Sequence, residues 1–378
     1  MHILADENMP YVEALFGPHG KVTRVAGRDI SADMLVDVDV LLVRSVTKVD
    51  SKLLAKANKL HFVGTATIGT DHVDEQLLAE RGITFTNAPG CNAYAVCDYV
   101  LSSLLLVAER RQLRLKGLTM GVIGIGNIGK RLLPRLEALG LNVLVCDPPR
   151  AEAESSFEST ALASLIAQSD IVTLHVPLLM TGRHKTHHLI GAAELAQLKP
   201  EAIIINACRG EVIDNQALKQ HLATHSEHSV VLDVWENEPQ PDPQLMALVD
   251  IATPHIAGYS QEGKAFGTSI VYDHWAALHG FAKADVQALL PTPELAAMTV
   301  AGKPTQGLLK QLVHAVYDVR NDDERMRAVS QQTGYFDRLR KSYPLRRELL
   351  STQINMSAGM PADNATTLAR LGFQCSDL

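Results

Sequence analysis

The sequence predicts an α/β protein built on parallel sheets, with two doubly wound domains and a smaller third domain. Short β-rich runs alternate with helical stretches, which is the pattern of βαβ units. Several runs, such as Val40–Val43, are apolar at every position, as in strands that are buried on both faces. A glycine-rich turn also joins one of these runs directly to a helical stretch, as in nucleotide-binding sheets.

The composition limits the class of protein. With 378 residues the chain is too long for one ordinary core, and its 46% apolar and 20% charged residues are typical of globular proteins. A net charge of -7, from 35 Lys+Arg against 42 Asp+Glu, argues against nucleic acid or an anionic membrane as the main partner. Five cysteines without a C-x-x-C pair suggest reduced thiols in a cytoplasmic protein. We recognise no signal peptide, and the most apolar run, 100–108, has roughly half the length of a spanning helix.

The predicted elements fall into three blocks. A Pro-Gly pair at 89–90 closes the first block, and a long apolar helix over about 92–115 leads out of it. A helix over 260–280 precedes the third block, where proline and glycine breakers cluster. We therefore expect domains over 1–93 with 257–280, over 94–256, and over 281–378. The predicted strands are 3–5, 38–43, 62–64, 83–86, 119–123, 143–146, 171–174, 202–205, 230–232 and 250–252.

The glycine-rich turn has the spacing of a dinucleotide site. Gly124, Gly126 and Gly129 follow a predicted strand and open a helix over 130–139. The first glycine permits the tight turn, the second lets a pyrophosphate approach the backbone, and the third lets the helix pack closely. Asp147, at the end of the next strand, would accept hydrogen bonds from a ribose diol and repel a 2′-phosphate. The turn therefore predicts NAD rather than NADP.

Three polar residues stand just past the ends of later strands. Arg209, Glu238 and His255 follow the strands at 202–205, 230–232 and 250–252. Ligands bind at the carboxyl ends of strands in open parallel sheets. A histidine suits the proton transfer that alcohol oxidation requires, and a carboxylate beside it would stabilise its charged form. An arginine can hold a carboxylate through two parallel hydrogen bonds. The set predicts hydride transfer from a 2-hydroxy acid.

These motifs together resemble the D-2-hydroxyacid dehydrogenase family. The resemblance rests on G-x-G-x-x-G at 124–129, N-x-x-R-G at 206–210, D-x-x-x-x-E-P at 233–239 and P-H-x-x-G at 254–258, and it covers about residues 1–280. It implies a flavodoxin-like substrate domain, a Rossmann NAD domain, and a catalytic role for the three residues above. It also implies further NAD contacts at Asn127, Ile128, Val176, Ala207, Cys208, Arg209, Asp233 and Gly258.

The C-terminal region narrows the resemblance. The segments at 3–8, 43–45, 90–92 and 255–260, and F-D-x-L-R at 336–340, resemble one branch of the family, the erythronate-4-phosphate dehydrogenases. This branch implies oxidation of 4-phospho-D-erythronate to a 2-oxo acid in vitamin B6 biosynthesis, and a homodimer formed by the C-terminal domain. It implies substrate contacts from Ser45, Thr67 and Tyr259.

A basic segment in the C-terminal region suggests where the substrate phosphate binds. Five cations fall within 335–348, although the chain as a whole is acidic. Arg209 is already assigned to the substrate carboxylate, so the phosphate needs other cations. Our hypothesis is that Arg44, with Arg340 or Arg346, holds the phosphate. A solvated helix face is the alternative reading of the segment.

Alternatives remain open. The protein would otherwise be a dehydrogenase for another acid, such as 3-phosphoglycerate or glycerate, or a dinucleotide-sensing corepressor. Two histidine clusters, at 184–188 and 221–228, lack an acid or cysteine nearby in sequence to complete a ligand set, so we expect no metal. Cys208 is adjacent to Arg209, but we interpret it as a buried, inert thiol.

Overall fold

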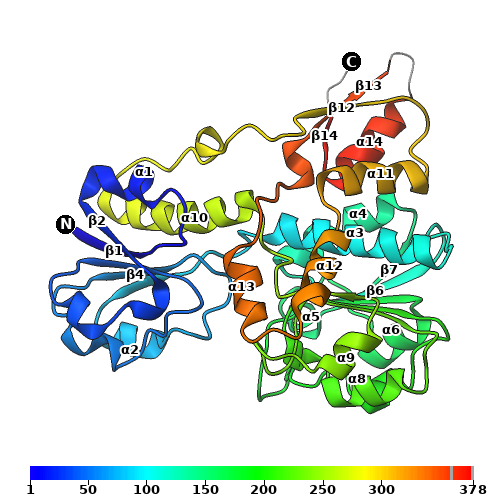
Figure 1. Ribbon diagram of the computed structural model, residues 1–378, viewed down its shortest axis with the longest axis horizontal. Helices are drawn as coiled ribbons and strands as arrows, with labels where there is room; N and C mark the ends of the chain where they lie inside the picture. The colour runs from blue at the N-terminus through cyan, green and yellow to red at the C-terminus, as the bar shows by residue number, and fades with distance from the viewer. Residues whose placement is uncertain (358–360, 376–378) are drawn as a thin grey trace. The chain divides into compact units, whose positions relative to one another are not determined.

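The computed structural model describes residues 1–357 and 361–375, which form two compact units (Figure 1). Unit 1 comprises Met1–Asn92 with Ser260–Thr292, and unit 2 comprises Ala93–Tyr259 with Pro293–Leu378. The C-terminal region therefore shares a unit with the glycine-rich turn. A separate domain beginning at 281, like the other expected boundaries, stays a prediction.

Unit 1 contains a five-stranded parallel sheet with the order β2-β1-β3-β4-β5. This is the flavodoxin-like order, so the expected class of this unit is confirmed. Strand β2 was not predicted, because its K-V-T-R-V sequence lacks a continuous apolar run. The elements are β1 (His2–Asp6), α1 (Val12–Phe16), β2 (Lys21–Val25), β3 (Val40–Val43), β4 (Phe62–Thr65), α2 (Glu75–Glu80), β5 (Thr84–Thr86) and α10 (Gln261–His279).

Helix α10 returns to the first sheet although it lies far away in sequence. Its N-cap, Ser260, accepts a hydrogen bond from Gly263 N at 2.8 Å, and Gly280 ends the helix in the left-handed conformation. Its buried Trp275 packs with Phe16 of α1 on one face of the sheet. The other face has its own apolar cluster, which includes Leu35 and Leu78. Both faces are therefore covered, as a parallel sheet requires.

Unit 2 contains a six-stranded parallel sheet with the order β11-β10-β9-β8-β6-β7. Strands β7-β6-β8-β9-β10 follow the Rossmann order without the strand that would lie outside β7, and β11 adds a strand beyond β10. Beside the outer edge of β7, Thr160 N donates a backbone hydrogen bond to Val145 O at 2.7 Å. The elements are α3 (Ala93–Arg110), β6 (Thr119–Ile123), α4 (Asn127–Ala138), β7 (Asn142–Cys146), α5 (Pro148–Ala153), α6 (Leu162–Gln168), β8 (Ile171–Leu174), α7 (Ala192–Leu195), β9 (Ile203–Asn206), α8 (Asn215–Leu222), β10 (Ser229–Leu232), α9 (Pro243–Leu248) and β11 (Ile251–Ala252).

The C-terminal region adds a three-stranded parallel sheet, β12-β13-β14, which was not predicted. Its strands are short and partly exposed, so they lack the apolar runs of the larger sheets. Asp98, which forms a buried ion pair with Arg135, accepts a hydrogen bond from Leu349 N of the C-terminal region at 2.9 Å. The elements are β12 (Ala297–Val300), α11 (Gln306–Val316), α12 (Arg320–Val329), α13 (Tyr335–Lys341), β13 (Gln353–Met356), α14 (Ala362–Leu371) and β14 (Gln374–Cys375).

Helix α12 is fastened to the edge of the six-stranded sheet. Asp323 accepts a hydrogen bond from Ala252 N, at the end of β11, at 2.8 Å. Arg327 donates to the carbonyls of Met246 and Val249 at 3.0 and 2.8 Å. These contacts fix the helix that precedes α13 within unit 2. Within the residues that the structure describes, no helix has the length and hydropathy of a membrane span.

Candidate active site

The glycine-rich turn has the geometry that its sequence predicts. Gly124 has φ +91, and a Cβ there would lie 2.5 Å from the carbonyl oxygen of His175. A Cβ on Gly129 would lie 2.3 Å from the carbonyl oxygen of Gly124. A Cβ on Gly126, by contrast, would meet nothing within 4 Å. Gly126 is also the N-cap of α4, where no side chain caps the helix, so its N–H groups can receive a phosphate.

Asp147 closes the turn from the neighbouring strand. Its carboxylate accepts hydrogen bonds from Ile125 N at 2.8 Å and Arg150 N at 3.1 Å. Asp147 is half-buried at the end of β7. An ionised carboxylate has about four acceptor positions, so capacity remains for a ribose diol. The residues of this turn therefore fit a bound NAD.

The remaining predicted NAD contacts all lie in unit 2. Their roles stay predictions. Asn127 and Ile128 open α4, Val176 follows β8 and borders the glycine turn, Ala207 and Cys208 follow β9, and Asp233 and Gly258 follow β10 and β11.

His255 and Glu238 form a hydrogen-bonded pair. The Nδ1 atom of His255 lies 2.8 Å from Oε2 of Glu238, and the other oxygen accepts from Trp235 N at 3.0 Å. Burial alone would raise the pKa of Glu238, but His255, the Trp235 N–H and the charge of Arg340 outweigh it and lower that pKa. Glu238 is therefore ionised at neutral pH. It assigns the proton to Nδ1 of His255 and leaves the lone pair on Nε2.

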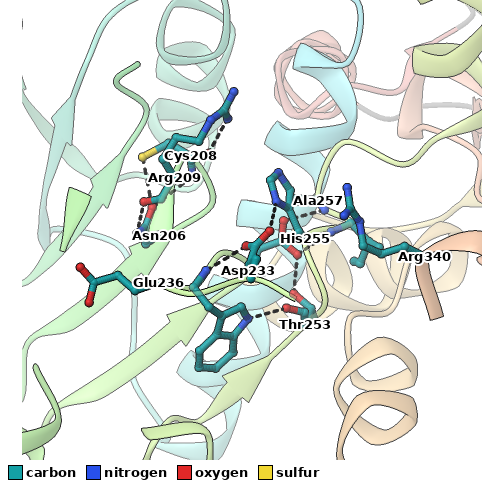
Figure 2. A network of polar contacts seen from close by, with 12 residues as sticks. Asn206, Cys208, Arg209, Asp233, Glu236, Thr253, His255, Ala257 and Arg340 are labelled. Atoms are coloured by element: carbon teal, nitrogen blue, oxygen red, sulfur yellow. Dashed lines mark hydrogen bonds and ion pairs between the residues drawn. The ribbon is translucent and has the colours of Figure 1, made fainter. Parts of the chain in front are cut away.

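Asp233 holds the loop that presents His255 (Figure 2). Its carboxylate accepts hydrogen bonds from Thr253 Oγ1 at 2.6 Å and from the backbone N–H groups of Ile256 and Ala257, both at 2.8 Å. Its carbonyl accepts from His255 N at 2.7 Å, and His255 has φ +56, the left-handed region. The sequence suggested Asp233 only as a cofactor contact. Its contribution to the loop was missed.

The turn that carries Arg209 is organised by Asn206. The side chain of Asn206 donates to Arg209 O at 3.0 Å and accepts from Cys208 N at 3.1 Å. A Cβ on Gly210 would lie only 2.0 Å from the carbonyl carbon of Trp235. The glycine of the N-x-x-R-G motif thus lets this turn press against the segment that leads to Glu238. The structure brings Arg209 and His255 to the same edge of the sheet (Figure 2), and Glu238 is hydrogen-bonded to His255.

Tyr259 contacts an arginine from the C-terminal region. Arg340 of α13 donates from Nε to the hydroxyl of Tyr259 at 3.2 Å, and its guanidinium lies 5.7 Å from the ring centroid. Burial would lower the pKa of Arg340, but the nearby Tyr259 and Glu238 raise it, so the guanidinium stays charged. In Figure 2, Arg209 and Arg340 lie on opposite sides of His255.

Arg346 has a different environment. It is 5% exposed, and its terminal nitrogens donate to the carbonyls of Ala95, Ile256 and Ala257 at 2.6, 3.4 and 3.1 Å. Its guanidinium lies 3.4 Å from the ring centroid of Tyr317. Arg346 therefore supports the backbone just after His255. This environment argues against the hypothesis that Arg346 binds the substrate phosphate.

The predicted substrate residues of unit 1 follow β3 and β4. Ser45 is exposed, while the hydroxyl of Thr67 donates to Gly69 O at 2.8 Å. Lys264, on α10, was missed by the sequence reasoning. Burial, and next the charge of Arg44, lower the pKa of Lys264 to about 8. Two cations thus lie close together in this unit, which a helical sequence pattern alone does not reveal.

The sequence analysis predicted no metal at the two histidine clusters and an inert thiol at Cys208. The structure changes the surroundings expected for one of the clusters. His188 lies 2.6 Å from Glu236 Oε1 and 3.7 Å from Asp214 Oδ2, so acids do accompany it. The expectation that no acid completes this group was wrong, because the ligand atoms of His188, Asp214 and Glu236 lie within 4.8 Å of one another. The absence of a metal stays a prediction. His221 and His228 bond to each other, 2.8 Å apart. Cys208 is buried, and burial raises its pKa to about 11.

Comparisons with known proteins agree with this geometry. Residues 106–257 match the family described as D-isomer specific 2-hydroxyacid dehydrogenase, NAD binding domain, and 289–372 match a domain of unknown function. A protein of Edwardsiella ictaluri named erythronate-4-phosphate dehydrogenase is 50% identical over 99% of both chains. One of the same name from Klebsiella pneumoniae is 49% identical over 99% of this chain and 98% of its own. The chain belongs to the erythronate-4-phosphate dehydrogenases, a branch of the D-2-hydroxyacid dehydrogenase family.

Solved structures resemble only part of this chain. The TT0316 protein of Thermus thermophilus has a TM-score of 0.63 at 25% identity and covers 75% of this chain and 98% of its own. D-Lactate dehydrogenase of Aquifex aeolicus, solved with NAD and lactic acid, has a TM-score of 0.59 at 24% identity and covers 74% and 96%. About a quarter of the chain lies outside each likeness. The relatives of the erythronate-4-phosphate dehydrogenase branch match that quarter too.

Proposed function

We propose that the protein oxidises 4-phospho-D-erythronate to (R)-3-hydroxy-2-oxo-4-phosphooxybutanoate in vitamin B6 biosynthesis. The observation that carries this proposal is the likeness, at about half of all positions, to proteins of that name over 99% of the chain. The likeness includes the catalytic loops and the C-terminal region together. The arrangement of Arg209, Glu238 and His255 supports the same chemistry.

His255 is the base in this proposal. Its Nε2 accepts the proton of the C2 hydroxyl, because the hydrogen bond to Glu238 places the other ring proton on Nδ1. The imidazolium that results is stabilised by the ionised Glu238. Since Glu238 is itself held by the Trp235 N–H, the ring keeps one orientation throughout the transfer.

Arg209 orients the substrate. Its guanidinium binds the C1 carboxylate and polarises the adjacent oxygen, which a lysine would do less well because it lacks the planar fork. The residues of the glycine turn would hold NAD, which would supply the acceptor for the hydride that leaves C2. Ser45, Thr67, Tyr259 and Arg44 remain the proposed substrate contacts.

Two further features belong to the proposal. The C-terminal region forms the interface of a homodimer, as the family resemblance implies, and size-exclusion chromatography with light scattering measures the mass. A monomer at micromolar concentration would contradict this. The protein acts in the cytoplasm, which its five free cysteines support, because secreted proteins usually form disulfides.

NADH formation by the purified protein tests the activity. The substrates compared are 4-phospho-D-erythronate, D-erythronate, 3-phosphoglycerate and D-lactate, each with a carbonyl trap that removes the 2-oxo product. We expect the highest kcat/KM for the phosphorylated four-carbon acid. A higher value for 3-phosphoglycerate would assign another substrate. No turnover of any acid by a protein that binds NADH would favour a dinucleotide-sensing corepressor.

A further inference from the structure

Arg340, in the C-terminal region, is held in place by one hydrogen bond, while within the described residues other N–H donors of its guanidinium group are unused. Arg340 is half-buried, and its Nε donates to the hydroxyl of Tyr259 at 3.2 Å. Across the described ranges 1–357 and 361–375, its two terminal nitrogens have no hydrogen-bond or ion-pair partner in the protein. A guanidinium fixed through Nε presents its terminal N–H groups as a fork, the geometry that binds phosphate through two hydrogen bonds.

The neighbouring arginines of the same segment show the contrast. Arg346 uses both terminal nitrogens on backbone carbonyls. Arg338, two residues before Arg340 on α13, is exposed and donates to Thr333 O and the side chain of Gln332. Of the three arginines compared, Arg340 alone combines burial with unused terminal donors.

The position of Arg340 fits one end of the proposed substrate. Arg209 and Arg340 lie on opposite sides of His255 (Figure 2). In 4-phospho-D-erythronate the carboxylate and the phosphate likewise lie on opposite sides of C2, the carbon that His255 would serve. A second guanidinium beyond the base therefore matches the second anion of the substrate.

We infer that Arg340 determines substrate specificity by binding the phosphate group of the substrate, and that Tyr259 fixes the orientation of the Arg340 guanidinium. This inference rests on the proposed function. The arginine comes from the region 289–372, which matches a different domain model from the NAD-binding region. The D-lactate dehydrogenase structure covers 74% of this chain, and lactate has no phosphate to bind. The C-terminal region thus adds a substrate contact to the dehydrogenase site.

Binding to the NADH complex tests this without requiring turnover. We would measure the Kd of 4-phospho-D-erythronate and of D-erythronate for the full-length protein saturated with NADH, by isothermal titration calorimetry. In Arg340→Met we expect the phosphorylated acid to bind about a hundredfold more weakly, because two charge-assisted hydrogen bonds are lost. D-Erythronate should change less than threefold. Arg340→Lys, which keeps the charge without the fork, should fall between.

The matched control is Arg338→Met on the same helix, which should change neither affinity. An unchanged NADH affinity and melting temperature in each variant establish that it folds. Equal weakening for both acids in Arg340→Met would overturn the inference, since Arg340 would then act on the shared part of the site. The inference would also be overturned if Arg340→Met still bound the phosphorylated acid more tightly than D-erythronate while Arg44→Met did not. Arg44 would then be the residue that binds the phosphate. If the unaltered protein does not oxidise 4-phospho-D-erythronate, the proposed function fails first.

Discussion

Exchanging Glu238 for glutamine tests the catalytic pair most sharply, because both carboxylate oxygens are acceptors. One oxygen accepts from His255 Nδ1 at 2.8 Å and the other from Trp235 N at 3.0 Å. Glutamine has one oxygen and one NH2 group at these positions, so it can satisfy only one of the two donors. Either orientation of the amide therefore damages the site.

The two orientations have different costs. If the amide oxygen faces His255, the NH2 group opposes the buried Trp235 N–H, and an unpaired buried donor costs about 1–3 kcal/mol. If the NH2 group faces His255, it donates to Nδ1 and moves the ring proton to Nε2, where the base is needed. Both orientations also lose the negative charge that stabilises the imidazolium. We expect kcat to fall by about 10²- to 10⁴-fold.

Steady-state NADH formation measures this effect, and NADH binding shows that the variant is folded. Glu236→Gln is the matched control, since Glu236 lies two residues away and bonds to His188 rather than His255. It should leave kcat within about threefold, while the affinity for NADH stays unchanged in both variants. A Glu238→Gln variant with kcat within threefold of the original protein would refute the assigned tautomer and the role of the pair.

Three further outcomes follow from particular contacts. Gly210→Ala should lower kcat/KM by about 10²-fold, because the backbone at Trp235 must move from 2.0 Å to the 3.4 Å of ordinary contact. Gly307→Ala, where a Cβ meets nothing within 4 Å, should retain activity in the same assay. Lys264→Met should raise the melting temperature at pH 7. The pKa of Lys264 in the folded protein is lowered to about 8, so the charged form destabilises the fold below that pH. The gain in melting temperature should vanish by about pH 10.5, where the lysine of the unfolded chain also loses its proton. An equal gain at pH 7 and pH 10.5 would contradict this. Iodoacetamide at pH 8 should leave Cys208 unmodified by mass spectrometry, because burial raises its pKa to about 11, and rapid alkylation of the folded protein would disprove it.

The sequence predicted the parts of the site whose geometry is local or is set by sheet topology. The motif predicted the tight turn at Gly124, whose φ is +91, and the strand 119–123 is β6 as predicted. Arg209 and His255 were grouped because parallel strands end at one edge. Their roles in the chemistry remain predictions that the experiments above test.

Contacts that depend on packing between distant segments could not be predicted from the sequence. Asp233 was recognised as polar and near a strand end, but three donors converge on its carboxylate only after β10 and β11 are paired. Lys264 meets the charge of Arg44 because α10 returns to the first sheet from far along the chain. Strands β12 to β14 were missed, since short, half-exposed strands carry little periodic signal.

The two tail arginines show why composition cannot assign a ligand. Arg340 and Arg346 lie six positions apart in one basic segment. The sequence-based hypothesis named either of them as a ligand of the substrate phosphate, with Arg346 as the candidate taken forward. Folding makes Arg346 internal, because the carbonyls of Ile256, Ala257 and Ala95 accept from its two terminal nitrogens. It leaves Arg340 with unused terminal donors, because the Tyr259 hydroxyl accepts from Nε. The distinction lies in how many acceptors surround each guanidinium, and that number is set by tertiary structure rather than by charge. The internal arginine also supports the loop that presents His255, so the same segment would serve the substrate through one arginine and the catalytic base through the other.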